Sequence, residues 1–138
     1  MFSIGELSKR TGVKVPTIRY YEQTGLLPEP NRTDGNQRRY SSASLERLSF
    51  IKHARELGFS IDAIASLIEL EDNPDRSCNK ATQIAREQLA SVQEKLRKLK
   101  TLEGELQRVA DGCHGNGASK DCYVLASLAD HRLCRSTH

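Results

Sequence analysis

The chain has 138 residues, of which 37% are hydrophobic, 5% are aromatic and 28% are charged, and it contains no tryptophan. This composition is too charged for a membrane protein and too apolar for wholesale disorder, and the length suits one ordinary domain or a small domain joined to an extended element. No apolar run is long enough for a membrane span or a secretion signal. We therefore expect a cytoplasmic protein with reduced thiols and no membrane contact.

The net charge of +3 is unevenly distributed along the chain. Residues 1–58 carry ten Lys and Arg against six Asp and Glu, residues 59–75 carry five acids and no base, and residues 76–138 carry eleven bases and seven acids. The basic N-terminal block suits a phosphate backbone, although a balance of +4 over that length is also common on ordinary protein surfaces.

The first 25 residues predict two short helices. Ser3 and Glu6 form a capping box, and Gly12 is a typical helix stop, so the first helix is expected between them. Pro16 can occupy the first position of a second helix, which ends near Gly25. Two short helices joined by a tight turn that contains glycine indicate a helix-turn-helix.

The next segment predicts a hairpin and then two further helices. Asp34-Gly35 is a strong hairpin-turn dipeptide with basic residues on both flanks, which is typical of a basic wing. Ser41 or Ser42 can cap a third helix, in which apolar residues recur every three positions, and Ser60 can cap a fourth. The acidic residues 69–75 are interpreted as a linker, and residues 1–72 as a winged helix-turn-helix domain.

Residues 76–110 predict one long helix, because they contain no proline and only Gly104 interrupts the helix formers. Apolar residues recur at alternating intervals of four and three, apart from one missed step at Glu103, which is the heptad pattern of a coiled coil. A helix of this length spans roughly 50 Å and cannot bury its stripe alone, so the same helix of a second chain is its natural partner. Folding back onto its own domain is the alternative. The stripe consists of Ala85, Leu89, Val92, Leu96, Leu99, Leu106 and Ala110.

Residues 111–138 contain a loop rich in Gly, Ser and Asn between Cys113 and Cys122, then a short apolar helix and a polar tail. Two thiols around such a loop are a modest signal for a metal site and could equally be two buried apolar side chains. No Cys has a His and an acid in a recognisable catalytic arrangement, and no glycine-rich phosphate loop is present, so an enzyme is not expected. Disulfides are disfavoured in the cytoplasm.

The spacing of the cysteines strengthens the metal interpretation. Cys78 and Cys113 are 35 residues apart, which is five heptads, so both fall on the apolar stripe yet lie roughly 52 Å apart along one helix. If two long helices pair antiparallel, Cys78 of one protomer meets Cys113 and Cys122 of the other. Three thiolates are soft donors that suit divalent zinc, cadmium, lead or mercury. His114 could complete a zinc site, and His131 with Cys134 could form an auxiliary site or belong to a frayed tail.

Several motifs carry a family resemblance. Ile4-Gly5-Glu6-Leu7, the run from Thr17 to Pro28, Arg38-Arg39-Tyr40 and Leu57-Gly58-Phe59-Ser60, together with the long helix and the loop bracketed by cysteines, resemble the MerR family of transcription regulators. The closest likeness is to its branch of divalent heavy-metal sensors. The resemblance implies a homodimer on promoter DNA that, with metal bound, bends and untwists an over-long promoter spacer so that RNA polymerase can engage. It also implies that Cys78 completes the partner's site, a Cys that the family's copper(I) sensors lack.

The helix-turn-helix and wing supply the candidate DNA contacts. Dimers of this kind place one helix in each of two major grooves and use flanking cations on phosphates. Arginine suits bidentate or phosphate contacts, and tyrosine hydroxyls can also reach phosphates. The candidates are Lys14, Thr17, Arg19 and Tyr21 around the second helix and Arg32, Arg38, Arg39 and Tyr40 in the wing.

The predicted fold is therefore mainly α, with a winged helix-turn-helix at 1–72, an antiparallel coiled-coil dimerisation helix at 76–110 and a metal-binding loop, short helix and tail at 111–138. The predicted function is a metal-responsive activator of resistance or efflux genes. The main alternative is a constitutive DNA-binding architectural protein with structural zinc, whose dimer should unfold when the metal is removed. A redox sensor lacks the necessary cysteine cluster, and a multidrug sensor would need a larger C-terminal domain.

Overall fold

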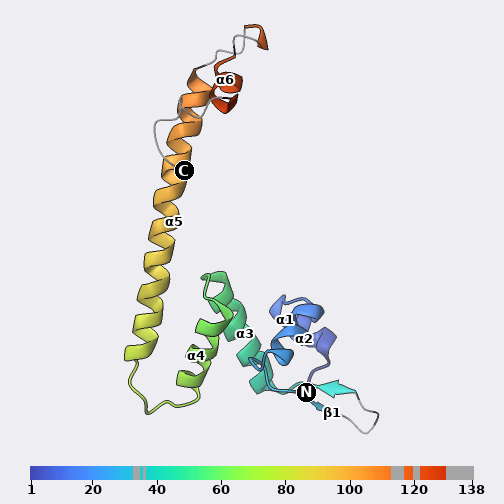
Figure 1. Cartoon of the computed structure of the whole chain (residues 1–138). Coiled ribbons are helices and arrows are strands. Elements are labelled where there is room, and N and C mark those ends of the chain that lie inside the picture. Colours follow the sequence, from blue (N-terminus) through green and yellow to red (C-terminus); the bar gives the residue numbers. More distant parts are fainter. Residues whose placement is uncertain (33–34, 36, 113–116, 120–121, 130–138) are drawn as a thin grey trace. The chain divides into compact units, whose positions relative to one another are not determined.

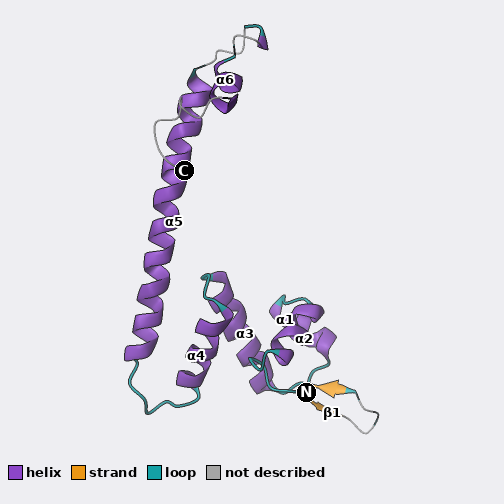
Figure 2. Ribbon diagram, in the orientation of Figure 1, coloured by secondary structure: helices purple, strands orange, loops and turns teal. Residues whose placement is uncertain are grey.

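The computed structural model describes the chain apart from residues 33–34, 36, 113–116, 120–121 and 130–138. The described part is mainly helical, with one small hairpin (Figures 1 and 2). It divides into two compact units, Met1–Ala85 and Arg86–His138. The predicted fold class is confirmed for the helix-turn-helix, the wing and the long helix.

The predicted helix-turn-helix is present as α1, Ile4–Thr11, and α2, Val15–Gln23. The Ser3 hydroxyl accepts a hydrogen bond from the Glu6 amide at 3.2 Å, which satisfies one of the amides that a helix start leaves open. Gly12 ends α1 with a φ of 76°, a conformation that a Cβ disfavours. α2 begins one residue before Pro16 rather than at it, and this proline lies in the first turn, where its missing amide hydrogen costs nothing.

The wing consists of β1, Asn31–Arg32, and β2, Arg38–Arg39, which pair antiparallel with Arg32 opposite Arg38. Tyr40 then exchanges two backbone hydrogen bonds with Phe2, at 2.7 and 2.8 Å, so the N-terminal segment is attached to the wing. Of the predicted turn pair, Asp34 lies outside the described residues.

Helices α3, Ser42–Glu56, and α4, Ile61–Glu71, complete the N-terminal unit, and their caps are the predicted Ser41 and Ser60. The prediction of a linker over residues 69–75 is wrong for its first three residues, which form the last turn of α4. Their acidic character suggested a linker, but Glu and Leu are strong helix formers, and the helix continues to Glu71, ahead of Pro74.

One hydrophobic core holds this unit together. It gathers apolar side chains from α1 to α4 and the wing, which is why five short elements are stable together although each alone is marginal. Its largest fully buried members are Leu7, Ile18, Leu27, Tyr40, Leu48, Ile51 and Ile64.

The long helix α5, Asn79–Asp111, begins three residues later than expected. The Ser77 hydroxyl accepts from the Asn79 amide at 3.2 Å, and the Cys78 carbonyl accepts from Thr82 at 3.0 Å, so the chain turns into the helix at Cys78. A short helix α6, Tyr123–Ala129, follows as predicted. Among the described helices, none has the length and apolar character that crossing a membrane requires.

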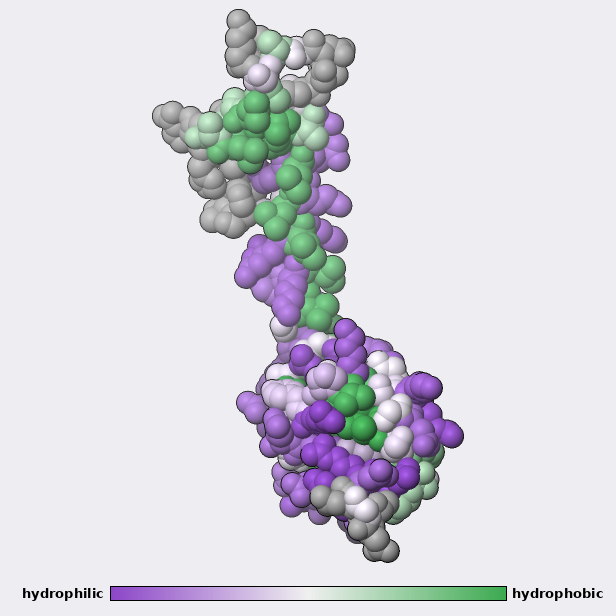
Figure 3. All heavy atoms as spheres, turned by 90° about the vertical axis from the view of Figure 1, so that its right-hand side faces the viewer, coloured by the Kyte–Doolittle hydropathy of each residue, from purple (hydrophilic) through white to green (hydrophobic). Residues whose placement is uncertain are grey.

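The predicted apolar stripe of α5 is exposed on the single chain. Figure 3 shows it as a continuous hydrophobic band along the helix. More than half of the surface of Leu89, Leu96, Leu99 and Leu106 is accessible, with values from 51% to 67%. Such a band is what a partner helix would cover.

Candidate functional site

The two faces of α2 separate core residues from candidate DNA contacts. Ile18 and Tyr21, three positions apart, face the core, while Arg19 and Tyr20 are exposed. Tyr21 was proposed from the sequence as a DNA contact, yet this residue is 7% exposed, whereas Tyr20 is 50% exposed. The helical period could have identified Tyr20 as the outward-facing ring.

The remaining candidates around α2 lie at its N-terminal end. Lys14 is the residue before the helix and is exposed, and Thr17 is partly exposed in the first turn. The first amides of a helix carry partial positive charge, which favours a phosphate there. Lys14, Thr17 and Arg19 therefore offer a cation, a hydroxyl and a guanidinium from one short stretch of accessible surface.

A buried cluster joins α2 to the wing. The Tyr40 hydroxyl donates to Oε1 of Glu22, and Nη1 of Arg38 lies 3.5 Å from Oε2 of the same carboxylate. Tyr40 is fully buried, and this burial, together with the hydrogen bond to Glu22, raises the pKa of its hydroxyl to about 12. Tyr40 was proposed as a DNA contact; in the structure its hydroxyl is directed at Glu22, so it holds the carboxylate that positions Arg38.

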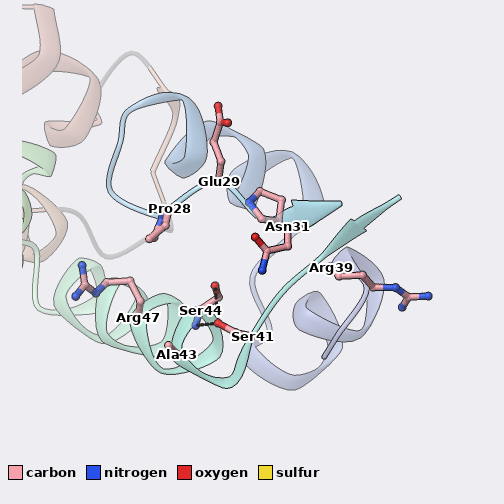
Figure 4. Close-up of a pocket in the computed structure, with 9 residues that line it drawn as sticks. Pro28, Glu29, Asn31, Arg39, Ser41, Ala43, Ser44 and Arg47 are labelled. Atoms are coloured by element: carbon pink, nitrogen blue, oxygen red, sulfur yellow. Dashed lines mark hydrogen bonds between the residues drawn. The ribbon is translucent and has the colours of Figure 1, made fainter. Parts of the chain in front are cut away.

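The other wing arginines lie at the surface. Arg32 is exposed on β1, and Arg39 is partly exposed on β2. Beside the wing is a pocket of about 200 Å³, lined by residues that include Pro28, Ser44 and Arg47. Figure 4 shows the Arg39 side chain directed away from the other residues of this pocket. Its guanidinium is therefore placed for an external partner.

Two of the predicted metal ligands can be located. Cys78 is exposed at the start of α5, and Cys122 is half-buried immediately before α6. The Cys122 carbonyl accepts the first hydrogen bond of α6, from Ala126 at 3.1 Å, so this residue is held by the helix that follows. Cys113, His114, His131 and Cys134 lie outside the described residues. Within the described part of a single chain, no three His, Cys, Asp or Glu side chains gather as a metal site would require.

Cys78 and Cys113, two of the predicted ligands, stand at opposite ends of α5 in the sequence. The 33 residues of α5 span about 50 Å at 1.5 Å per residue. Cys78 directly precedes this helix, whereas Cys113 follows its last residue by two positions.

Comparison with known proteins identifies the family. A family model described as "MerR HTH family regulatory protein" matches residues 2–71, and one described as "MerR, DNA binding" matches residues 45–109. The chain belongs to the MerR family. The residues matched by the first model contain α1 to α4 and the wing, and the family that the sequence motifs predicted is confirmed.

Individual MerR proteins match over nearly the whole chain. The mercuric resistance operon regulatory protein of Serratia marcescens is 40% identical over 91% of this chain and 86% of its own length. The HTH-type transcriptional regulator ZntR of Escherichia coli is 38% identical, covering 93% and 92% of the two chains. The crystal structure of PbrR691 from Ralstonia metallidurans, in complex with lead(II), superposes with a TM-score of 0.80 at 38% identity, over 93% of this chain and 99% of the other.

Proposed function

We propose that this MerR protein is a metal-responsive regulator that binds promoter DNA as a homodimer and activates resistance or efflux genes when a divalent soft metal occupies a site shared by the protomers. The observation that carries the proposal is the separation of Cys78 from the 113–122 loop by the full length of α5. Support comes from relatives that are named for mercury resistance and captured with lead(II).

The DNA half of the proposal rests on exposed cations and polar groups around α2 and the wing. Lys14 and Arg19 are exposed at α2, and Arg32 lies opposite Arg38 in the wing. Phosphate contacts by such residues position a protein on the duplex, and a helix in the major groove reads the bases. Such a regulator acts where its promoter DNA lies, in the cytoplasm.

The metal half rests on the donor set. Cys78 and Cys122 are accessible or partly accessible thiols, and Cys113 follows α5 directly in sequence. Three thiolates favour zinc, cadmium, lead or mercury over hard cations such as magnesium. When bound, such an ion supplies bonds that link the start of one α5 to the loop of the partner. His114 could act as a fourth ligand for zinc.

The start of α5 could transmit a displacement at Cys78 to the DNA-binding unit. Ile84, in the second turn of α5, is buried, and the compact unit extends to Ala85. Ala81 and Ala85 line a groove of about 530 Å³ together with Phe50 of α3 and other residues of α3 and α4. A shift at Cys78 would therefore move a helix start that lines this groove with α3 and α4, and would re-angle the two DNA-binding units of the dimer. Bending the promoter in this way would let RNA polymerase engage.

Promoter transcription in vitro tests the response. Titration with zinc, cadmium, lead, mercury and copper(I) should show activation by one or more of the divalent ions. Cys78→Ser should abolish activation while leaving DNA affinity within about threefold, because Cys78 lies outside α2 and the wing. Cys134→Ser, in the tail, tests separately whether the auxiliary site contributes to the response. Normal induction of the Cys78→Ser protein would overturn the shared site.

Mixed dimers test the sharing directly. A heterodimer of one Cys78→Ser and one Cys113→Ser protomer keeps one intact site if ligands come from both chains, and none if each site lies within one chain. We expect the heterodimer to bind one metal ion per dimer where each homodimeric variant binds none. Absence of metal binding by the heterodimer would contradict the arrangement.

The alternative, an architectural DNA-binding protein with structural zinc, predicts a different result. Removing metal with a chelator should then unfold the dimer, because metal-binding free energy would be folding free energy. For a sensor, the metal-free dimer should stay folded and DNA-bound, as measured by circular dichroism and gel shift.

A further inference from the structure

The base of the loop between α5 and α6 is closed by an unusual contact. Gly112 is the residue before Cys113, and Tyr123 is the residue after Cys122. A Cβ on Gly112 would overlap the Tyr123 ring and lie 2.6 Å from its Cε1 atom. The ring therefore lies directly on the backbone at the end of α5, in space that only glycine leaves available.

An ion pair on α5 also contacts this ring. Nη1 of Arg108 donates to the Tyr123 hydroxyl, and the guanidinium carbon lies 5.7 Å from the ring centroid. Nη2 of Arg108 donates to Oε2 of Glu105 at 2.9 Å, and both of these side chains are almost nine-tenths buried. Residues 85–104 of α5 are largely exposed, so Glu105 and Arg108 begin a separate buried stretch near the end of the helix.

Burial of this charged pair calls for an explanation beyond stability. Desolvation of an Arg and a Glu costs about as much as their attraction returns, so such pairs are poor evidence of stabilisation and better evidence of a fixed geometry. Here the pair fixes the guanidinium that contacts Tyr123. The four residues form one unit, which we name the loop clamp: Glu105, Arg108, Gly112 and Tyr123.

We propose that the loop clamp sets the separation of Cys113 and Cys122 and so prepares the thiolate pair for its ligand. This inference rests on the proposed metal-sensing function. The eight residues between these cysteines could extend to about 30 Å, and bringing the ends of such a loop together costs entropy. Cys113 directly follows Gly112 and Cys122 directly precedes Tyr123. The Gly112–Tyr123 contact therefore brings the ends of the loop together before any ligand binds, and folding rather than binding supplies the entropy of loop closure. The four clamp residues are positioning residues, because none of them supplies a thiolate.

The thiol–disulfide equilibrium with glutathione measures this preparation without any metal. In the full-length chain with Cys78→Ser and Cys134→Ser, Cys113 and Cys122 remain as the thiol pair. In the oxidation, the two protein thiols react with one glutathione disulfide. The products are a protein disulfide and two molecules of reduced glutathione. The equilibrium constant is the effective concentration of one thiol at the other.

We expect Gly112→Ala and Tyr123→Leu each to lower this effective concentration at least tenfold. Tyr123→Phe keeps the ring on Gly112 and should lower it threefold or less. Gly104→Ala is the matched control, since a Cβ at that position of the same helix meets nothing within 4 Å. The double variant Gly112→Ala with Tyr123→Leu should lose little more than either single variant, because both remove the same contact.

Equal constants for Gly112→Ala, Tyr123→Leu and Gly104→Ala would overturn the clamp. Unchanged DNA affinity in all variants verifies that the N-terminal unit remains folded. Cadmium titration of the variants with all cysteines restored, followed by thiolate charge-transfer absorbance, should show binding at least tenfold weaker than wild type for the first two. If wild type itself took up no metal while the glutathione constants still differed, the proposed function would fail and the clamp would stand.

Discussion

In the N-terminal unit, Met1–Ala85, short helices enclose one core, whereas along α5 in the C-terminal unit the leucines face outward. Leu48 in α3 is fully buried within its own chain, while Leu96 in α5 is 51% exposed. The first unit can therefore reach its structure alone. The second has an exposed apolar surface of the kind that a partner chain covers.

This difference suits the two units to different tasks, DNA binding in the first and dimerisation in the second. A self-contained unit keeps its DNA-binding surface intact whether or not the effector is present. A helix that pairs with a partner would make dimerisation, and the closing of the proposed shared site, sensitive to changes at its two ends. Stability of the first unit and assembly of the second should therefore respond to different substitutions.

The largest expected effect is on assembly. Leu96→Asp removes one leucine from each of two paired helices and places a carboxylate in the stripe, which should weaken the dimer on the order of 1,000-fold, or about 4 kcal/mol. Ser91→Asp adds the same charge away from the stripe and should change little. Sedimentation equilibrium measures both. A Leu96→Asp protein that stayed dimeric at nanomolar concentration would show that the stripe is covered in some other way.

The matching substitution in the core should act on folding instead. Leu48→Ala leaves a cavity in the N-terminal unit and should lower its free energy of unfolding by about 3 kcal/mol. Leu57→Ala, at the exposed end of α3, should cost less than about 0.5 kcal/mol. Urea unfolding at two protein concentrations checks the comparison, because the Leu48→Ala deficit should not depend on concentration. A deficit that shrank at high concentration would mean that this unit, too, depends on its partner.

The features that could be predicted from the sequence depend on residues close together in the chain. Ser3, Gly12 and Ser60 act within a few residues of themselves, so their roles as caps and stops followed from spacing alone, and the structure confirms them. The heptads of α5 revealed an apolar stripe, but antiparallel pairing of two chains stays a prediction. Residues 69–71 were predicted to be a linker because they are acidic, but the helix propensity of Glu and Leu extends α4 to Glu71.

Contacts between distant residues could not be predicted in this way. Tyr40 and Glu22 are 18 positions apart, and their pairing depends on how the wing folds back onto α2. Arg108 and Tyr123 are 15 positions apart, on either side of a loop with no periodic pattern. Arg108 would have been assigned to the solvated face of a charged helix. The contact between Arg108 and Tyr123 could be identified only from the structure, which brings the end of α5 and the start of α6 together.

The smallest expected effect concerns the buried cluster at the wing and its dependence on pH. The pKa of Tyr40 rises from 10.0 when exposed to about 12 in the folded unit, so the folded state holds this proton more tightly. The resulting stabilisation is fully present below pH 10 and is lost as the pH rises through 12, and it amounts to at most about 2.7 kcal/mol. Tyr40→Phe has no such proton to lose, so its stability should fall less than that of wild type between pH 10 and 12. Urea unfolding across this range measures the difference, with Tyr20→Phe, at a half-exposed ring, as the control. If the free energy of unfolding changed equally with pH in wild type and Tyr40→Phe, the hydroxyl would not be held by Glu22. The wing would then not belong to the part of the first unit that is stable by itself.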